Sequence, residues 1–276
     1  MYPSKLNASA KSHLLVPLAL VAALGMSGCQ TARNSGTTGS IASSAAPRGE
    51  ADWRRDVSSW GERYRKDPKN AEAAVNYAQA LRSTGQREQA VAVLEQSSIH
   101  NPNDTQVLGA YGRALAENGN FEQALDVLSR SHTPDQPDWR ILSAQGAVLD
   151  QMGKHDEARR YYASALKIVP DEPSVMSNLG LSYALSKNLP EAEETLRRAN
   201  AYGSREPRVR QNLALVVGLQ GRFKEAEDIM RADLSAEDAA VQVADLRNML
   251  ASEKAAPARK GKPSPRMLQQ QAARVE

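Results

Sequence analysis

The feature that most constrains the fold is a 34-residue period, which runs without insertion or deletion from Ala71 to Ala240. Three columns of the repeat are nearly uniform in residue type. One column is always alanine, one is always small, and one is apolar or aromatic. Five recurrences at fixed spacing argue against chance periodicity in a generic helical bundle. The chain therefore repeats one supersecondary unit, and each copy buries its apolar face against its neighbours. The alanine column consists of Ala90, Ala124, Ala158, Ala192 and Ala226, the small column of Ala78, Gly112, Gly146, Gly180 and Ala214, and the apolar column of Leu94, Leu128, Tyr162, Leu196 and Met230.

Each unit contains two apolar stripes at helical spacing, separated by a short break. In the unit 173–206, proline stands at the start of both stripes, where its missing N–H has no helical partner to lose. The pattern predicts helix A, a tight turn and helix B. Glycine is expected at the turn because it adopts a left-handed backbone without cost. In the fourth unit Lys187 replaces that glycine, and Asn188 is the neighbour best suited to the conformation. The turn glycines are Gly85, Gly119, Gly153 and Gly221.

These columns resemble the tetratricopeptide repeat (TPR), which has a small residue at position 8, alanine at positions 20 and 27, and often proline at position 32. The resemblance implies an all-α TPR solenoid. It has about five helix-pair repeats, with a helical cap at each end. We expect the TPR domain to span 53–253. Its full repeats are 71–104, 105–138, 139–172, 173–206 and 207–240.

The two caps are predicted from the sequences that flank the repeats. Residues 53–67 place Trp53 and Trp60 on one helical face, which a terminal repeat needs in order to hide its apolar side. A binding surface for a partner is the alternative use of these tryptophans. After the last repeat, Ser235 and Asp238 form a capping-box pattern, and the helix from Ser235 to Glu253 is the C-terminal cap.

Residues 1–28 have the composition of an export signal. A basic start precedes an apolar run of 11 residues, Leu14 to Leu24, which is too short to span a bilayer. Small residues then lead to Cys29, the only cysteine of the chain. This resembles a bacterial lipoprotein signal, which implies lipidation at Cys29. Gln30 in place of an aspartate favours the periplasmic face of the outer membrane. An ordinary secretory signal is the alternative. Residues 29–52 are rich in Ser, Thr, Gly and Ala, and predict a flexible tether.

The C-terminal residues 254–276 hold six basic residues and one acidic residue, with three prolines. This composition predicts a disordered basic tail. The tail is either solvated or in contact with an anionic surface. The rest of the mature chain is close to neutral, which argues against nucleic-acid binding. The histidines and carboxylates do not share metal-ligand spacing with the cysteine, so the sequence indicates no metal site. It also contains no nucleophile motif and no phosphate loop. We therefore expect neither a cofactor nor an enzyme.

In TPR proteins the A helices line a groove that binds a peptide or a partner helix, and positions 2, 5, 6, 9, 12 and 13 point into it. Asparagine stands at position 6 in three repeats and can hold a peptide backbone through its amide. The first half of the predicted groove is polar and cationic. The carboxylate clamp of chaperone-binding repeats is absent, because Val75 and Gln79 stand at its positions. The predicted partner-binding residues are Asn76, Gln79, Arg82, Arg113, Arg140, Asn178, Arg208 and Asn212.

The combination of a lipoprotein signal, a tether, about five repeats and the segment from Arg208 to Leu250 resembles the TadD lipoproteins of tight-adherence (Flp) pilus systems. The resemblance implies a non-enzymatic outer-membrane scaffold that binds the pilus secretin or other assembly components. A general periplasmic adaptor for cell-wall or outer-membrane assembly factors is the alternative. An enzyme that captures substrate with its repeats is a third hypothesis. It is disfavoured because repeats and caps occupy nearly all of the chain expected to be ordered.

Overall fold

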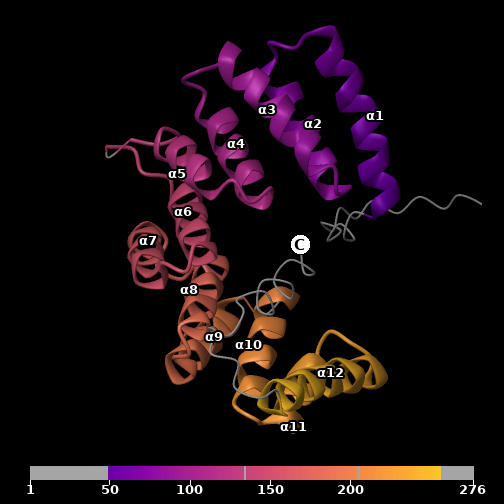
Figure 1. Cartoon of the computed structure of the whole chain (residues 1–276), viewed down its shortest axis with the longest axis vertical. Coiled ribbons are helices and arrows are strands. Elements are labelled where there is room, and N and C mark those ends of the chain that lie inside the picture. The colour runs from indigo at the N-terminus through magenta and orange to yellow at the C-terminus, as the bar shows by residue number, and fades with distance from the viewer. Residues whose placement is uncertain (1–48, 134, 204–205, 256–276) are drawn as a thin grey trace, which may run out of the picture. The chain divides into compact units, whose positions relative to one another are not determined.

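A computed structural model describes residues 49–133, 135–203 and 206–255, and these residues form helices joined by short connections (Figure 1). The predicted signal (1–28), nearly all of the predicted tether (29–52) and nearly all of the predicted tail (254–276) lie outside the described residues. No helix among the described residues is long and apolar enough to cross a membrane. The helices are α1 Glu50–Lys66, α2 Ala71–Ser83, α3 Arg87–His100, α4 Thr105–Glu117, α5 Phe121–Ser129, α6 Trp139–Gln151, α7 His155–Ile168, α8 Pro173–Leu185, α9 Leu189–Tyr202, α10 Pro207–Leu219, α11 Phe223–Met230 and α12 Ala236–Ala255.

The even-numbered helices α2 to α10 are the predicted A helices, and each begins 34 residues after the one before it. The residue before each of them is polar or acidic. Asn70, Asp104, Asp138 and Glu172 all accept backbone N–H groups of the first turn with their side chains. These bonds satisfy donors that a helix start leaves without a partner. Glu206 makes no such bond before α10. The predicted all-α, helix-pair fold is confirmed.

The turns between A and B helices use the left-handed backbone that the glycines predict. Gly85, Gly119, Gly153 and Gly221 have φ between 76° and 84°. In the fourth repeat Lys187 itself takes this conformation, with φ 65°. Asn188 instead has φ −89° and stands just before α9. The prediction that Asn188 adopts the left-handed backbone is therefore wrong. The fourth turn has the same register as the other turns, so the left-handed position falls on Lys187 although this backbone is strained for lysine.

The small column is where the A and B helices approach most closely. A Cβ atom added at Gly112 would lie 2.5 Å from Leu128 Cγ, and one at Gly146 would lie 2.6 Å from Tyr162 Cε1. These partners belong to the apolar column of the same repeats. Both columns are fully buried, including Leu94, Leu128, Tyr162 and Leu196. The two columns therefore form the contact between the A and B helices in each repeat.

Helical caps lie at both ends of the array. Helix α1 packs on α2, with Gly61 buried against the ring of Tyr77 and the rings of Tyr64 and Tyr77 5.8 Å apart. It begins at Glu50, a little before the predicted start. At the other end α12 packs on α10 and α11, and buries Val243 and Leu246. One half of the predicted capping box is present, since Ser235 Oγ accepts the backbone N–H of Asp238 at 3.1 Å. The Asp238 carboxylate accepts the Ser235 hydroxyl at 2.7 Å.

Candidate protein-binding face

The helices α2, α4, α6, α8 and α10 form one continuous surface, which we call the A-helix face. Each of them contacts the next A helix as well as the B helices on either side of it. In the described part of the chain, the B helices make their main contacts with A helices rather than with one another. The predicted partner-binding residues all belong to this row of A helices.

Two of the three predicted asparagines connect neighbouring A helices. Asn178 Nδ2 donates to Ser143 Oγ at 3.1 Å, and Asn212 Nδ2 donates to Ser177 Oγ at 2.9 Å. Both serines are buried, and both asparagines are half-buried. One donor of each amide is thus used inside the array. The third asparagine, Asn76, donates to the carbonyl oxygen of Glu72 one turn earlier in its own helix, at 2.9 Å.

Arg82 is also part of an inter-repeat contact. Its Nε donates to Glu117 Oε2 at 2.6 Å, and its Nη2 pairs with Oε1 of the same carboxylate. The two side chains are only 24% and 22% exposed, so this two-point ion pair is partly shielded from water. It links α2 to α4. Sequence reasoning named Arg82 as a partner-binding residue and did not find Glu117.

The remaining predicted residues differ in their surroundings. Gln79 and Arg140 are exposed, and the Arg140 guanidinium lies 4.4 Å from the ring centre of Trp139. Arg208 is exposed as well. Arg113 is half-buried on α4, and its pKa is lowered, first by burial and then by the positive charge of Arg82. Arg82, Arg113 and Arg140 come from three successive A helices, so the structure brings the predicted cations of the first half of this face together.

The most buried polar cluster lies between α6, α7 and α8, and sequence reasoning missed it. The Asp150 carboxylate accepts hydrogen bonds from Tyr162 Oη at 2.9 Å and Ser182 Oγ at 2.8 Å, and pairs with His155 Nδ1 at 2.8 Å. Burial raises the pKa of Asp150, and its three partners oppose that shift. Burial, together with the neighbouring carboxylate, also raises the pKa of Tyr162. His155 stands where the sister repeats have Phe121 and Phe223, and here it is the partner of a buried acid.

Two further ionic contacts hold the last repeats together. Arg210 Nε donates to Asp233 Oδ2 at 2.7 Å, and both side chains are 13% exposed. Asp233 stands at position 27, where the repeat pattern has alanine, and Arg210 explains this departure in the last repeat. Glu193 of α9 accepts hydrogen bonds from Arg222, Gln220 and Arg197. These bonds, that of Arg222 first, lower its pKa to about 2.

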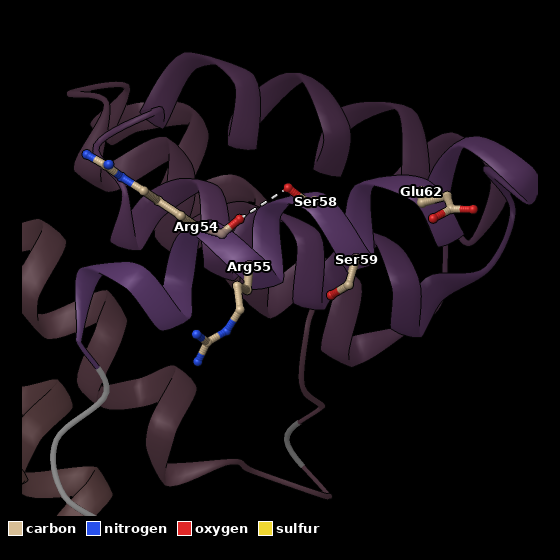
Figure 2. A pocket seen from close by; sticks show the side chains of 5 residues that line it. All are labelled: Arg54, Arg55, Ser58, Ser59 and Glu62. Carbon is tan, nitrogen blue, oxygen red and sulfur yellow. Dashed lines mark hydrogen bonds between the residues drawn. The ribbon is translucent and has the colours of Figure 1, made fainter. Parts of the chain in front are cut away.

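An open depression lies on α1, and Figure 2 shows the side chains that line it. Its lining residues within 49–133, 135–203 and 206–255 all come from this one helix. Their charges are largely satisfied locally, since Arg54 pairs with Glu50 at 2.6 Å and Arg55 pairs with Asp52. We assign no ligand to this depression. No group of three metal-binding side chains occurs among the described residues either. The lining residues are Arg54, Arg55, Ser58, Ser59 and Glu62.

Comparison with known families supports the repeat assignment. A model described as "Tetratricopeptide repeat" matches residues 151–216. The chain contains tetratricopeptide repeats. A second model, described as "Anaphase-promoting complex, cyclosome, subunit 3", matches residues 56–131. No curated protein sequence matches the chain.

Solved structures similar to this TPR chain share its fold at low sequence identity. PilW, described as a widely conserved type IV pilus biogenesis factor, is 17% identical with a TM-score of 0.60, over 70% of this chain and 91% of PilW. A thermophilic TPR protein of Thermus thermophilus is 22% identical with a TM-score of 0.55, over 66% of this chain and 98% of that protein. A chain of the APC/C hetero-tetramer Cut9–Hcn1 is 18% identical with a TM-score of 0.55, over 70% of this chain and 40% of the matched chain.

Taken together, the fold and the family match identify a TPR scaffold for protein–protein interaction. Families with this repeat fold are typically non-enzymatic. The arrangement on the A-helix face agrees with such a role, because its exposed side chains, such as Gln79 and Arg140, offer hydrogen-bond donors and positive charge.

Proposed function

We propose that the protein is a lipid-anchored scaffold at the periplasmic face of the outer membrane, where it binds components of a tight-adherence (Flp) pilus, in the manner of TadD lipoproteins. The pilus secretin is the first candidate partner. The anchor is Cys29, and the binding surface is the A-helix face. The repeats position a partner, and no chemical step is required of them.

The observation that carries the binding part of this proposal is the continuity of the A-helix face. Five helices in direct succession present exposed or half-buried polar side chains, among them Gln79, Arg113, Arg140 and Arg208. An extended segment that crosses several repeats gains small contributions from each, which suits recognition of a protein chain. The pilus part is supported by the lipoprotein-like signal, by the resemblance in 208–250, and by a fold shared with the pilus biogenesis factor PilW.

Site-specific photo-crosslinking in the native cell tests the proposal. A photoreactive residue at Gln79 lies exposed on α2, and a matched one at Arg160 lies exposed on the B helix α7. We expect secretin or other pilus components to be crosslinked from position 79 and not from position 160. Mass spectrometry of the crosslinked products identifies them. Crosslinks to pilus components from position 160 alone would contradict the use of the A-helix face.

The alternative, a general periplasmic adaptor, gives a different result in the same experiment. Cell-wall enzymes or outer-membrane assembly factors would then be recovered from position 79 in place of pilus components. The anchor is tested separately by Cys29→Ala, which we expect to release the protein from the membrane fraction into the periplasm. Retention of that variant in the membrane would mean that Cys29 is not the anchor.

A further inference from the structure

Three arginines from successive A helices lie close together on the A-helix face, namely Arg82 of α2, Arg113 of α4 and Arg140 at the start of α6. Arg113 stands in the middle of them. Its guanidinium folds back over Gly109, one turn earlier, with Nη1 3.6 Å and Nη2 3.8 Å from the place that a Cβ of residue 109 would occupy. The central arginine thus lies along its own helix, beside a glycine against which Ile141 of α6 also packs, with its Cδ1 2.8 Å from the same Cβ position.

The neighbouring carboxylates are already occupied. Glu117 makes a two-point contact with Arg82. Asp138 caps α6 by accepting the backbone N–H of Arg140 at 2.7 Å. Among the described residues, Arg113 makes no ion pair and no hydrogen bond. The cluster therefore holds three positive and two negative groups. Arg82 is paired with Glu117 and Arg140 is exposed to water, so Arg113 is the half-buried cation that has no ion pair among the described residues. Removing a charge from water without a partner is unfavourable for the free protein.

We infer that Arg113 anchors the carboxylate of an aspartate or glutamate side chain in a bound protein segment, with Arg82 and Arg140 on either side. The planar guanidinium matches a carboxylate in a two-point contact, which makes it suited to read one acidic residue. This inference rests on the proposed function of the A-helix face and specifies the chemistry of the partner.

The ends of the chain itself are poor candidates for this anion. Residues 1–48 contain no aspartate or glutamate, and residues 256–276 contain one acidic side chain, Glu276, among five basic ones. Charge complementarity therefore favours an acidic segment of another protein. A random peptide library includes acidic, neutral and basic candidates alike, so it tests this choice without assuming it.

The stability of the free protein provides the first test. If Arg113 serves binding and does not stabilise the free protein, Arg113→Met removes a charge that has no ion pair and keeps a side chain that packs as the methylene groups of arginine do. We expect its melting temperature to rise by roughly 2–4 °C, the shift that about 1 kcal/mol gives in a domain of this size. The control is Arg160→Met, an equal change of charge at an exposed position on α7, which we expect to leave the temperature within about 1 °C. A lower melting temperature for Arg113→Met would show that the arginine serves the fold, and would overturn the inference.

Binding provides the second test. Random peptides of about 12 residues, long enough to cross more than one repeat, are selected on the full-length protein, and the tightest is measured against both variants. We expect the selected peptides to share one acidic residue, and Arg113→Met to weaken binding by about 10- to 100-fold, as loss of a charged hydrogen-bonded contact does. Arg160→Met should change the affinity by less than about twofold if the effect is local.

The double-mutant cycle decides whether the two groups meet. Replacing the shared acidic residue of the peptide by its amide should cost as much as Arg113→Met, and the two losses should not add. Additive losses, equal losses from Arg113→Met and Arg160→Met, selection of peptides without a shared acid, or selection of none would each refute the acidic anchor. The crosslinking experiment is independent: pilus components can fail to appear there while the acidic peptide still binds Arg113, and the reverse is equally observable.

Discussion

Replacing Asp150 by alanine should weaken the contact between repeats 3 and 4 more than replacing any exposed acidic residue by alanine. Its carboxylate is 7% exposed and serves three partners on α7 and α8. Tyr162 and Ser182 are almost completely buried, so their hydroxyl groups cannot turn to water when the acceptor is removed. His155 is 22% exposed and can be hydrated again.

The expected magnitude follows from these partners. Each buried hydroxyl that loses its acceptor costs about 1–2 kcal/mol, which gives roughly 2–4 kcal/mol for the pair. Relief of the buried carboxylate, whose pKa is raised by burial, offsets part of this cost. The net loss for Asp150→Ala is therefore about 1–3 kcal/mol. Asp156→Ala is the matched control, since Asp156 is 88% exposed on α7, and we expect it to cost less than about 0.5 kcal/mol.

Repeat arrays often do not unfold in one step, so the assay must report on this region directly. Native-state hydrogen exchange of α6, α7 and α8 measures the opening free energy there, and urea denaturation gives the global value. The same exchange measurement on α2 and α3 gives an internal reference. A loss below about 0.5 kcal/mol in α6–α8, or a loss equal to that of Asp156→Ala, would refute a stabilising role for the network.

Three further perturbations have expected outcomes. Lys187→Gly should stabilise the fold by about 0.5–1 kcal/mol in urea denaturation, because the residue has φ 65°, and no gain would contradict strain at this turn. The pKa of Glu193 is lowered to about 2, below its unfolded value of about 4.3, so ionised Glu193 stabilises the fold above about pH 4.3 and this stabilisation is lost as the pH falls towards 2. Glu193→Gln should therefore make the free energy of unfolding depend less on pH in this range. An acid unfolding curve identical to that of the unsubstituted protein would count against the network. A double-mutant cycle of Arg82→Met and Glu117→Gln should give a coupling of about 1 kcal/mol, and strictly additive losses would mean that the pair contributes nothing.

The sequence predicted the fold well because its period is a strong physical constraint. Columns such as Gly146 and Tyr162 specify which faces meet inside a repeat, and the glycines specify where each turn lies. The starts of four A helices coincide with Asp104 and its equivalents, whose side chains cap the first turns. These features act within a single repeat, and their recurrence at a fixed spacing in all five repeats makes them recognisable in the sequence.

Contacts between repeats were harder to predict. Asn178 and Asn212 were interpreted as partner-binding groups, and the structure shows that they donate to serines of the preceding A helix. Their use by a partner stays a prediction. The buried Asp150 network joins residues 5, 12 and 32 positions apart, for which no column of the repeat gives a signal. A substitution that looks degenerate, as at Asp233, can equally be half of a compensated pair.

One regularity was available in the sequence and was not used. Arg82 with Glu117, Ser143 with Asn178, and Ser177 with Asn212 are each separated by 35 residues. Position n of one A helix therefore lies beside position n + 1 of the next. A search for complementary polar residues at this spacing finds all three contacts from the sequence alone.

This offset means that the five repeats are not interchangeable, although each has nearly the same backbone. In repeat 4, Ser177 accepts a hydrogen bond from Asn212 of the following repeat, and Asn178 donates one to Ser143 of the preceding repeat. Repeat 2 carries Gly109 and Ala110 at the same two positions. A chimera that exchanges repeats 2 and 4 would keep every column of the consensus and lose both hydrogen bonds. Shortening or permuting the array by whole repeats thus requires complementary polar residues at each new junction. The order of the repeats is specified by these side-chain pairs between neighbouring repeats, which are not part of the repeat consensus.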